Sequence, residues 1–322
     1  MTTAVRERPD LGRLGYGAAA VGNLYRAVDD ESARRLLDAA WDAGIRYYDT
    51  APHYGLGLSE RRLGEMLRGR PREEFVVSTK VGRLLVPDPE GAGRRDDDLF
   101  EVPADHRRVW DFSESGIRRS LEESLGRLGL DSVDVLYLHD VERSGDARQA
   151  IDSGVAALAR MRDEGLVRAI GIGSSDLGAI ERAVRTGAID LVMLPGRYTL
   201  LEAPAQDVVL PLCEEKGVGI VNVAVFNSGL LATPEPSESS PYEYRQAPPD
   251  KLRRAHDLAR ACREVGVELP TAALQFSARH PAVVSVVVGA DTPEQIRQNA
   301  ERMRAPVPDE LWRVLADRGL LP

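Results

Sequence analysis

One stretch of the sequence points to the fold and the site together: Tyr47-Tyr48-Asp49-Thr50-Ala51-Pro52-His53-Tyr54-Gly55. A short β-prone run, Ile45 to Asp49, ends inside it, and turn-forming residues follow. Asp49 lies five residues before Tyr54, so both side chains can point into one cleft beyond the end of a strand. A simpler interpretation also fits, in which Asp49 caps the next helix and Tyr54 is a half-buried ring. The remainder of the chain has to decide between the two.

The chain has 322 residues, of which 43 % are hydrophobic and 29 % are charged, and its formal net charge is −9. That length is enough for one large α/β domain or two smaller ones. An acidic chain without a basic run is poorly suited to bind nucleic acid or an anionic membrane. We therefore expect neither as a partner.

The two cysteines, Cys213 and Cys262, fall in helix-like segments and fit no metal-ligand spacing. We therefore expect no bound metal and no disulfide framework, which suits a reducing cytoplasm. Residues 1–10 are polar and lack the apolar core of a signal peptide, so we expect a flexible N-terminus there. No apolar run approaches the roughly 18 residues needed to cross a bilayer. These features predict a soluble cytoplasmic protein.

Short strand-like runs alternate with amphipathic helical patterns over almost the whole chain. We expect strands at residues 14–21, 45–49, 75–80, 133–139, 169–173, 191–194, 219–225 and 283–288. We expect helices at residues 29–44, 59–67, 113–128, 151–164, 177–185, 207–216, 251–265, 271–279, 293–302 and 308–318, with Ser59 as the cap of the second. This alternation predicts parallel pairing and a single α/β domain, residues 1–322, folded as a (β/α)8 TIM barrel. Functional residues of such a barrel gather at the carboxyl ends of its strands.

A doubly wound open sheet is the alternative architecture. It would need a Gly-x-Gly-x-x-Gly turn after the first strand, whereas Gly12-Arg13-Leu14-Gly15-Tyr16-Gly17 has a different spacing and begins a strand. Two segments break the strand–helix rhythm, residues 81–111 and the Pro/Ser-rich residues 233–250, and we expect both to be loops. Loops as long as the first one usually have a function in a compact domain.

Three consecutive strands are each expected to end on a different ionisable side chain: Asp49, Lys80 and His139. Tyr54 follows the first of them, and all four would face the same mouth of a barrel. Taken singly, Lys80 can simply leave the barrel at its rim, and His139 can be a histidine with only structural hydrogen bonds. The combination, at the face where barrel enzymes carry out their chemistry, predicts a catalytic site.

These four groups suit proton transfer coupled to hydride transfer. A phenol with an unperturbed pKa of about 10 needs help to react at neutral pH, and a nearby ammonium such as that of Lys80 lowers the pKa of the Tyr54 phenol. Asp49 would hold Lys80 charged and oriented, and His139 would hydrogen-bond the reacting oxygen. None of these side chains donates hydride, so the reaction requires a redox cofactor.

Several motifs resemble those of the aldo-keto reductase superfamily and occur in that family's order from about Leu11 to Arg302. They are Asp49-Thr50-Ala51-x-x-Tyr54-Gly55 with Ser59-Glu60 and Leu63-Gly64, then Ser78-Thr79-Lys80, Leu136-Tyr137-Leu138-His139, Ala169-Ile170-Gly171-Ile172-Gly173 and Pro293-Glu294-Gln295-Ile296-x-x-Asn299. The resemblance implies a (β/α)8 barrel with a nicotinamide cofactor, NAD or NADP, across its mouth. It also implies that Tyr54 is the general acid/base, that Lys80 tunes it, that Asp49 orients Lys80, and that His139 positions the substrate oxygen.

Other stretches are similar to the aldose 1-dehydrogenase branch of that superfamily, which includes L-fucose and D-threo-aldose dehydrogenases, with L-galactose and pyridoxal dehydrogenases as relatives. They are Gly22-Asn23-Leu24-Tyr25-Arg26-Ala27, Tyr54-Gly55-Leu56-Gly57-Leu58-Ser59-Glu60, Gly196-Arg197-Tyr198-Thr199-Leu200-Leu201 and Phe226-Asn227-Ser228-Gly229. The similarity implies oxidation of the anomeric carbon of a sugar to a lactone. Tyr54, as phenolate, would then remove the C1 hydroxyl proton while hydride leaves C1.

The resemblance also suggests which residues bind the cofactor. The candidates are Gly22, Asn23, Leu24, Ser174, Ser175, Phe226, Asn227, Ser228, Gly229, Leu230, Gly289, Ala290, Gln295 and Asn299. The chain departs from the family pattern in places: Ser174 and Ser175 stand where many members have a Ser-Asn pair that binds the nicotinamide carboxamide. Pro195 stands where a glutamine is common, and Val223 or Phe226 would have to replace a missing stacking tyrosine.

The charge pattern after the last strand predicts NAD rather than NADP. NADP-dependent relatives place Lys or Ser and an Arg there, whereas this chain has Gly289-Ala290-Asp291-Thr292 and then Gln295. A dianionic 2′-phosphate would lack charge-assisted hydrogen bonds and would be repelled by Asp291. The alternative is that Arg297 or Arg302 reaches the phosphate. Gly289 and Ala290 also precede a helix N-terminus, where backbone N–H groups suit a phosphate.

Tyr25, His53 and Trp110 are the candidate substrate residues, and Phe100 is a further candidate for a lid that residues 81–111 would form over the mouth. The aromatic ones can equally be anchors of a loop. The substrate is expected to be a small sugar or aldehyde, and nothing in the sequence identifies it or indicates an oligomeric state.

Other functions stay open at this point. The same four residues would serve an NADPH-dependent reductase of aldehydes or ketones, or a pyridoxal dehydrogenase-like enzyme. Some barrels of this superfamily are cofactor-binding regulatory subunits of membrane channels, and the complete set of four residues argues against that function here.

Overall fold

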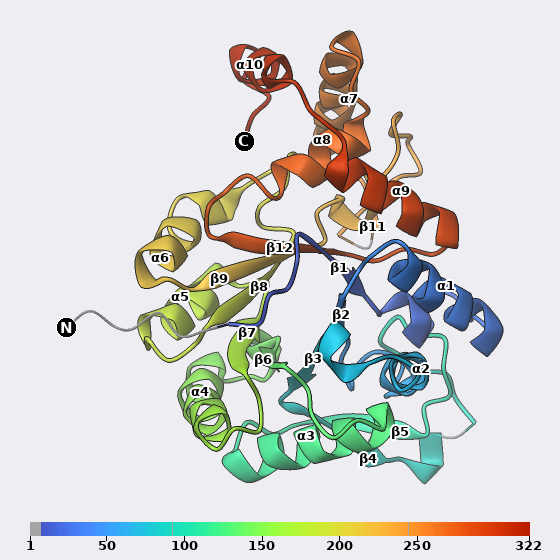
Figure 1. Ribbon diagram of the computed structural model, residues 1–322, viewed down its shortest axis with the longest axis vertical. Helices are drawn as coiled ribbons and strands as arrows, with labels where there is room; N and C mark the ends of the chain where they lie inside the picture. The colour runs from blue at the N-terminus through green and yellow to red at the C-terminus, as the bar shows by residue number, and fades with distance from the viewer. Residues whose placement is uncertain (1–7, 92, 244) are drawn as a thin grey trace.

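Eight parallel strands close into a barrel in the computed structural model, which describes residues 8–91, 93–243 and 245–322 (Figure 1). The strands are β1 (Leu14–Gly17), β2 (Tyr47–Asp49), β3 (Val76–Val81), β6 (Val135–His139), β7 (Ala169–Gly173), β8 (Leu191–Pro195), β9 (Gly219–Val223) and β12 (Val283–Val288). Their order is β1-β12-β9-β8-β7-β6-β3-β2, and β1 pairs with both β12 and β2 to close the ring. The predicted (β/α)8 barrel is confirmed, and the open sheet is excluded. The expected flexible N-terminus falls mainly on residues 1–7, which lie outside the described residues.

Helices surround this barrel, and each helix expected from the sequence is present with ends that shift by a few residues (Figure 1). They are α1 (Asp30–Asp42), α2 (Leu58–Leu67), α3 (Glu114–Leu128), α4 (Ala147–Asp163), α5 (Leu177–Arg185), α6 (Val209–Lys216), α7 (Pro249–Glu264), α8 (Leu269–Phe276), α9 (Pro293–Arg304) and α10 (Asp309–Asp317). Within the described ranges, none of the helices has both the length and the apolar character that crossing a membrane requires.

Polar side chains cap several of the helices at their N-termini. Asp29 caps α1 and Ser113 caps α3, each by accepting a hydrogen bond from a backbone N–H of the first turn. The prediction that Ser59 caps α2 is wrong. That helix begins one residue earlier, after Gly57, whose left-handed backbone (φ 82°) forms the cap. The Ser59 hydroxyl instead donates to the carbonyl oxygen of Ala18 at 2.7 Å and so ties α2 to the segment after β1.

Residues 81–111 form a β-hairpin rather than the predicted loop. The strands β4 (Arg83–Pro87) and β5 (His106–Trp110) pair antiparallel beside the barrel. The prediction failed because neither strand shows the apolar alternation of a half-buried strand. We call the connecting residues 88–91 and 93–105 the hairpin tip. Residues 233–250 likewise contain two short strands, β10 (Pro241–Tyr242) and β11 (Arg245–Gln246).

Aromatic and aliphatic side chains fill the interior of the barrel below its mouth. Tyr47, Tyr137 and Val287 belong to this cluster and are at most 4 % exposed. The Tyr47 hydroxyl lies 3.0 Å from Ser78 Oγ and 3.3 Å from the Tyr137 hydroxyl, so the buried phenols satisfy one another. The barrel interior is therefore a packed core, and the side chains at the carboxyl ends of the strands lie above this core.

Helices α2 and α3 approach most closely at a glycine. A Cβ atom on Gly64 would lie 2.0 Å from the carbonyl oxygen of Leu128, which is backbone and cannot swing aside. Gly126, in α3, has nothing within 4 Å of its Cβ position. Because α2 directly follows the stretch from Tyr47 to Gly55, the tight contact at Gly64 supports that stretch from behind.

Gly64→Ala is expected to lower the free energy of unfolding by about 2 kcal/mol or more, because overpacking a tight contact costs about 1–3 kcal/mol. Gly126→Ala is the matched control and should be neutral or stabilising by up to about 1 kcal/mol, since alanine is the better helix former. Thermal unfolding followed by circular dichroism measures both variants. Equal melting temperatures for the two would contradict the close packing described here.

Candidate active site

The structure brings the four predicted catalytic residues together at the mouth of the barrel. Asp49, Lys80 and His139 lie at the carboxyl ends of β2, β3 and β6, and Tyr54 follows β2. The Lys80 ammonium is 2.6 Å from Asp49 Oδ2 and 3.1 Å from the Tyr54 hydroxyl. The ring centroids of Tyr54 and His139 are 5.9 Å apart, edge to face. Four ionisable groups from separate parts of the chain therefore share one small volume.

Asp49 is not the cap of a helix. Its Oδ1 atom accepts a hydrogen bond from the Ser78 hydroxyl at 2.7 Å, while Oδ2 faces Lys80. Asp49 is 3 % exposed and Lys80 is 2 % exposed. Buried charges of this kind are tolerated when they are paired and hydrogen-bonded, as these are. The simpler interpretation of the opening stretch is therefore wrong for Asp49.

Two glycines determine where Tyr54 lies. Gly55 has a left-handed backbone (φ 62°), and a Cβ atom there would lie 2.2 Å from the carbonyl oxygen of Gly22. Gly22, in the short turn Ala20–Gly22 after β1, packs in the same way against the backbone of Tyr54. The segment after β1 can lie directly on the tyrosine's backbone only because neither glycine carries a side chain.

Burial raises the pKa of Tyr54, and the Lys80 ammonium opposes that rise without cancelling it. The lysine acts in the predicted direction, but the net shift is upward because the phenol loses its contact with water. Burial lowers the pKa of Lys80, but the Asp49 carboxylate and the Tyr54 phenol outweigh burial, and the net pKa is raised. Lys80 therefore remains protonated at neutral pH.

His139 and His53 are both neutral imidazoles at physiological pH. Burial lowers the pKa of His139 well below its ordinary value, and the cations of Arg83 and Lys80 act in the same direction. Burial likewise lowers the pKa of His53, helped by Arg83 and Arg108. The two rings lie 5.5 Å apart, centroid to centroid. They can offer hydrogen bonds to a substrate without adding charge beside the phenol.

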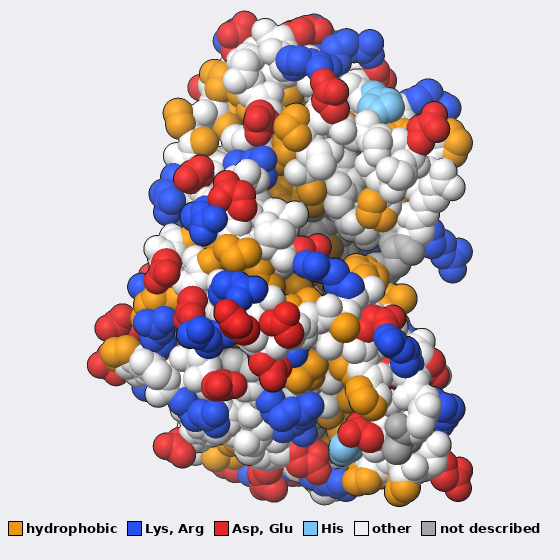
Figure 2. Space-filling model, turned by 90° about the vertical axis from the view of Figure 1, so that its right-hand side faces the viewer, with side chains coloured by type: hydrophobic (Ala, Val, Ile, Leu, Met, Phe, Trp, Pro, Cys, Tyr) orange, Lys and Arg blue, Asp and Glu red, His pale blue; other side chains and the backbone are white. Residues whose placement is uncertain are grey.

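A cavity of about 530 Å³ opens above Tyr54, Lys80 and His139. Other predicted residues that line it are Leu24, His53, Phe100, Ser175, Asn227 and Ser228. One face of the molecule is visibly hollowed at mid-height, with acidic and basic side chains interspersed around the hollow (Figure 2). The cavity is large enough for a small substrate beside the reactive end of a cofactor.

Two predicted substrate residues lie away from this cavity or at its edge. Trp110 is not among the lining residues; its ring stacks on Phe112 with 5.9 Å between centroids, and the Arg83 guanidinium lies 4.5 Å from its centroid. Tyr25 is 54 % exposed, and its N–H donates to the carbonyl oxygen of Leu99 at the cavity rim. Trp110 therefore anchors the hairpin, which is the alternative that the sequence left open for it.

Most of the predicted cofactor residues lie outside the cavity lining. They are Gly22, Asn23, Ser174, Phe226, Gly229, Leu230, Gly289, Ala290, Gln295 and Asn299. Asn23 Oδ1 accepts a hydrogen bond from the Val28 N–H, and Gln295 Oε1 accepts one from the Asp291 N–H, so both side chains fold their own loops. Asn227 differs, because among the described residues its buried Oδ1 atom has no hydrogen-bond partner. That atom is an acceptor available to the amide or hydroxyl of a bound cofactor.

The donors of Ser174 and Ser175 are engaged by a carboxylate that the sequence analysis missed. Glu142, in the short turn Val141–Arg143 after β6, accepts from the Ser174 hydroxyl at 2.7 Å and from the Ser175 N–H at 3.1 Å. Other charged residues at the cavity were missed as well: Asp98, Asp140, Arg143, Arg197 and Glu243. Asp140 directly follows His139 and could have been found from its place at a strand end. Asp98 lies in the irregular hairpin tip, where no sequence pattern marks it.

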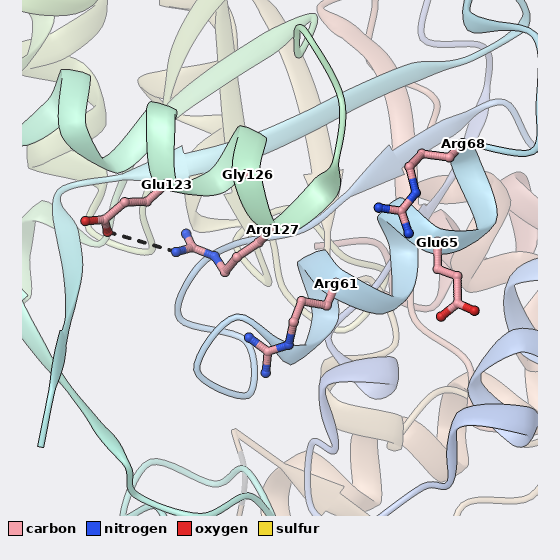
Figure 3. Close-up of a pocket in the computed structure, with 6 residues that line it drawn as sticks. All are labelled: Arg61, Glu65, Arg68, Glu123, Gly126 and Arg127. Atoms are coloured by element: carbon pink, nitrogen blue, oxygen red, sulfur yellow. Dashed lines mark ion pairs between the residues drawn. The ribbon is translucent and has the colours of Figure 1, made fainter. Parts of the chain in front are cut away.

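A second hollow lies outside the barrel between α2 and α3 (Figure 3). It is lined by Arg61, Arg68 and Arg127 together with Glu65 and Glu123, and Arg127 points toward Glu123 at 4.0 Å. Arg127 also contacts the buried carboxylate of Glu60 at 2.5 Å, so this buried acid beside the hollow is already paired. In the described parts of the chain, no His, Cys, Asp and Glu side chains are grouped so as to hold a metal ion. The barrel mouth is therefore the candidate site.

Comparison with known sequences supports this assignment. A model of the aldo/keto reductase family matches residues 13–317. D-threo-aldose 1-dehydrogenase from a Pseudomonas species is 56 % identical over 311 residues, which are 96 % of this chain and 94 % of the relative. Pyridoxal 4-dehydrogenase from Microbacterium luteolum is 39 % identical and covers 98 % of both chains. L-galactose dehydrogenase from Arabidopsis thaliana is 30 % identical and covers 90 % of this chain and 83 % of its own.

Solved structures agree with the fold. The holo form of aldo-keto reductase AKR11C1 from Bacillus halodurans has a TM-score of 0.74 at 27 % identity, with 96 % of this chain and 92 % of that chain covered. Glycerol dehydrogenase AKR11B4 from Gluconobacter oxydans has the same TM-score at 21 % identity, covering 100 % of this chain and 98 % of that one. The second likeness concerns the fold alone.

Proposed function

The chain belongs to the aldo/keto reductase family, and from that premise we propose that it is an NAD-dependent aldose 1-dehydrogenase, which oxidises the anomeric carbon of a sugar to a lactone. Membership of the family makes the protein an NAD(P)-dependent oxidoreductase that acts on a small molecule. The observation that carries the substrate class is the 56 % identity to D-threo-aldose 1-dehydrogenase over 96 % of the chain.

Tyr54 is the general base when the sugar is oxidised. As phenolate, its oxygen removes the proton from the C1 hydroxyl while hydride leaves C1, and the carbon–oxygen bond becomes the carbonyl of the lactone. The nicotinamide ring supplies the hydride acceptor when it is bound. His139, which is neutral, donates a hydrogen bond to the C1 oxygen and positions it beside the phenol.

Lys80 and Asp49 support the phenol without touching the sugar. The ammonium, 3.1 Å from the Tyr54 oxygen and only 2 % exposed as a residue, stabilises the phenolate by Coulomb attraction. Asp49 and the carbonyl oxygen of Thr50 hold two of its hydrogen-bonding positions, at 2.6 and 2.9 Å. The remaining donor is thereby directed at the phenol.

The preference for NAD rests on the junction between β12 and α9. Asp291 lies there, Arg297 pairs with Glu294 at 2.9 Å, and Arg302 is 3.4 Å from Glu268, so either arginine would have to leave an acidic partner to bind a 2′-phosphate. Arg26 does reach the junction, because its Nη2 atom donates to the Asp291 carbonyl oxygen at 2.9 Å. Arg26, which was not among the arginines predicted to reach the phosphate, is therefore a further candidate for that contact.

The proposal also covers the residues that bind the cofactor, the extent of the catalytic domain and the cellular location of the protein. The cofactor would be held by the predicted residues at the cavity, Leu24, Ser175, Asn227 and Ser228, and by Gly289 and Ala290 before α9. We assign residues 1–322 to one catalytic domain in the cytoplasm, and the free, buried state of Cys213 and Cys262 supports that location.

Oxidation of pyridoxal is a second candidate, because pyridoxal 4-dehydrogenase is 39 % identical over 98 % of the chain. It uses the same four residues and differs in the molecule that fills the cavity. Initial rates with a panel of aldoses and with pyridoxal, followed at the nicotinamide absorbance, decide between the two. Turnover of pyridoxal without turnover of any aldose would overturn the leading proposal.

Tyr54→Phe is expected to lower kcat by about 10³-fold or more, because general acid–base catalysis contributes about 10²–10⁴-fold. Its dissociation constant for NAD, from fluorescence titration, should stay within a few-fold of the wild-type value. Tyr198→Phe is the matched control, since Tyr198 packs on Phe276 and does not line the cavity. Near-normal turnover by the Tyr54 variant would contradict the mechanism.

The raised pKa of Tyr54 determines how kcat/KM for sugar oxidation depends on pH. Oxidation needs the phenolate, so its kcat/KM should rise about tenfold per pH unit from about pH 7 to about pH 9. Carbonyl reduction in the reverse direction needs the neutral phenol and should be flat over the same range. Lys80→Met should move the oxidative profile to higher pH, because the ammonium that favours phenolate is lost. An oxidation rate independent of pH in this range would show that Tyr54 is not the titrating base.

The kcat/KM with NAD is expected to exceed that with NADP by about tenfold or more, because Asp291 repels the 2′-phosphate. Asp291→Ala should lower the ratio of kcat/KM with NAD to kcat/KM with NADP. Asp309→Ala, which changes an exposed acid in α10, should leave that ratio unchanged. Arg26→Gln should leave the ratio unchanged. A wild-type preference for NADP that disappears in the Arg26 variant would show instead that Arg26 binds the phosphate.

A further inference from the structure

One wall of the cavity carries charged and polar side chains that face one another without touching. Asp98 Oδ2 is 3.7 Å from His53 Nε2 and 3.6 Å from Arg143 Nη2, and Arg143 Nη1 is 3.9 Å from Asp140 Oδ2. We call His53, Asp98, Asp140 and Arg143 the polar wall; all four line the cavity. These separations exceed hydrogen-bond length, so the groups attract one another but do not use up their donors and acceptors.

The long distances between charged groups are specific to the polar wall and do not occur throughout the hairpin. In the same hairpin, Arg108 holds Asp96 with two contacts of 2.6 and 2.7 Å. Asp98, in contrast, has no side-chain hydrogen bond among the described residues, although its side chain is only 25 % exposed. His53 Nδ1 is buried and also has no partner within them, and His53 as a whole is 7 % exposed. Buried polar groups without partners are rare and indicate a missing ligand or water.

The polar wall lies next to Tyr54 and His139, the two residues between which the reacting oxygen of the substrate is expected to bind. His139 Nε2 lies 3.8 Å from Asp140 Oδ2, and His53 neighbours both Tyr54 and His139. Asp140 is held in place from behind, because its carboxylate pairs with the buried guanidinium of Arg83. A molecule whose C1 oxygen lies between Tyr54 and His139 therefore places its next carbons against this wall.

The chemistry of the wall fits hydroxyl groups better than a charged group. A carboxylate accepts hydrogen bonds from hydroxyls, a guanidinium donates them, and a neutral imidazole can do either. The charges of Arg83 and Arg143 balance those of Asp98 and Asp140, so no net positive charge is left to attract a phosphate or carboxylate.

We propose that Asp98 and Arg143, together with His53, form the subsite that binds the hydroxyl groups next to the reacting carbon of a neutral sugar. This inference rests on the proposed function and names the residues that select its substrate. Asp98 accepts from one hydroxyl and Arg143 donates to its neighbour, so the pair distinguishes the configuration of adjacent hydroxyls. Polar groups left unpaired by a substrate without those hydroxyls make that substrate a poor one.

The test pairs variants with substrate analogues. Asp98→Asn and Arg143→Gln are assayed with the best aldose found for the wild-type enzyme and with its 2-deoxy and 3-deoxy analogues. Each variant should lose about 10- to 100-fold in kcat/KM with the full sugar, as expected for a hydrogen bond to a charged group. With the deoxy analogue that lacks the contacted hydroxyl, the same variant should lose less than about threefold, because that contact is already absent.

Two controls separate this effect from a general disturbance. Asp97→Ala changes an exposed acid beside Asp98 that does not line the cavity, and it should behave as wild type with every sugar. The melting temperature and the dissociation constant for NAD, measured without sugar, should be the same in all variants.

Failure of the proposed subsite and failure of the proposed function give different results in these assays. Equal losses with the full sugar and with both deoxy analogues would overturn the subsite, while aldose oxidation by the wild-type enzyme would leave the proposed function intact. A higher wild-type kcat/KM with a phosphorylated or carboxylated aldehyde than with any neutral sugar would also overturn it, because the arginines would then serve an anion. Absence of aldose turnover in the wild-type enzyme would overturn the proposed function and the subsite together, before any variant is made.

Discussion

The buried contact between Lys80 and Asp49 is the interaction on which the rest of this structure depends. Asp49 pairs in register with Ser78 on the neighbouring strand, two residues before Lys80, so the parallel register of β2 and β3 brings ammonium and carboxylate to 2.6 Å. A slip of one residue would turn Lys80 to the opposite face of the sheet. Either charge would destabilise the fold if it were buried without the other. The register that pairs β2 with β3 therefore also places these two charges together at the mouth of the barrel.

Beside that pair, Tyr54 is the group whose charge is expected to change during the reaction. The two imidazoles around Tyr54 are neutral, and the other charged groups of the cavity stand on its walls. A proton arriving at or leaving the Tyr54 oxygen then changes the charge of a single group, which already faces the fixed ammonium of Lys80. Preorganised electrostatics of this kind need no rearrangement during the reaction.

The sequence was informative where regular structure ends on a polar residue and uninformative elsewhere. Asp49, Lys80 and His139 could be predicted because an apolar run shows where each strand stops. Asp98 and Arg143 could not, since they lie in irregular segments and approach each other only after the hairpin has folded beside the barrel. For Trp110 the sequence left substrate contact and hairpin anchor both open, because hydrophobicity indicates that a ring will pack but not against which partner. The cofactor residues came from family resemblance, and their contacts stay predictions.

The β4–β5 hairpin is fastened to the barrel at its base and packed against the Tyr54 stretch at its tip. Its base is fastened to the barrel by the buried guanidinium of Arg83 and by the stacked rings of Trp110 and Phe112. The hairpin tip supplies Asp98 to the cavity without contributing a strand to the barrel. The tip also places Phe100, which is 4 % exposed, against the rings of His53 and Tyr54. A change at Phe100 would therefore disturb the site of proton transfer as well as the tip. Within one hairpin, substrate choice can therefore change through a polar side chain such as Asp98, whereas the apolar side chain of Phe100 is constrained by the catalytic tyrosine.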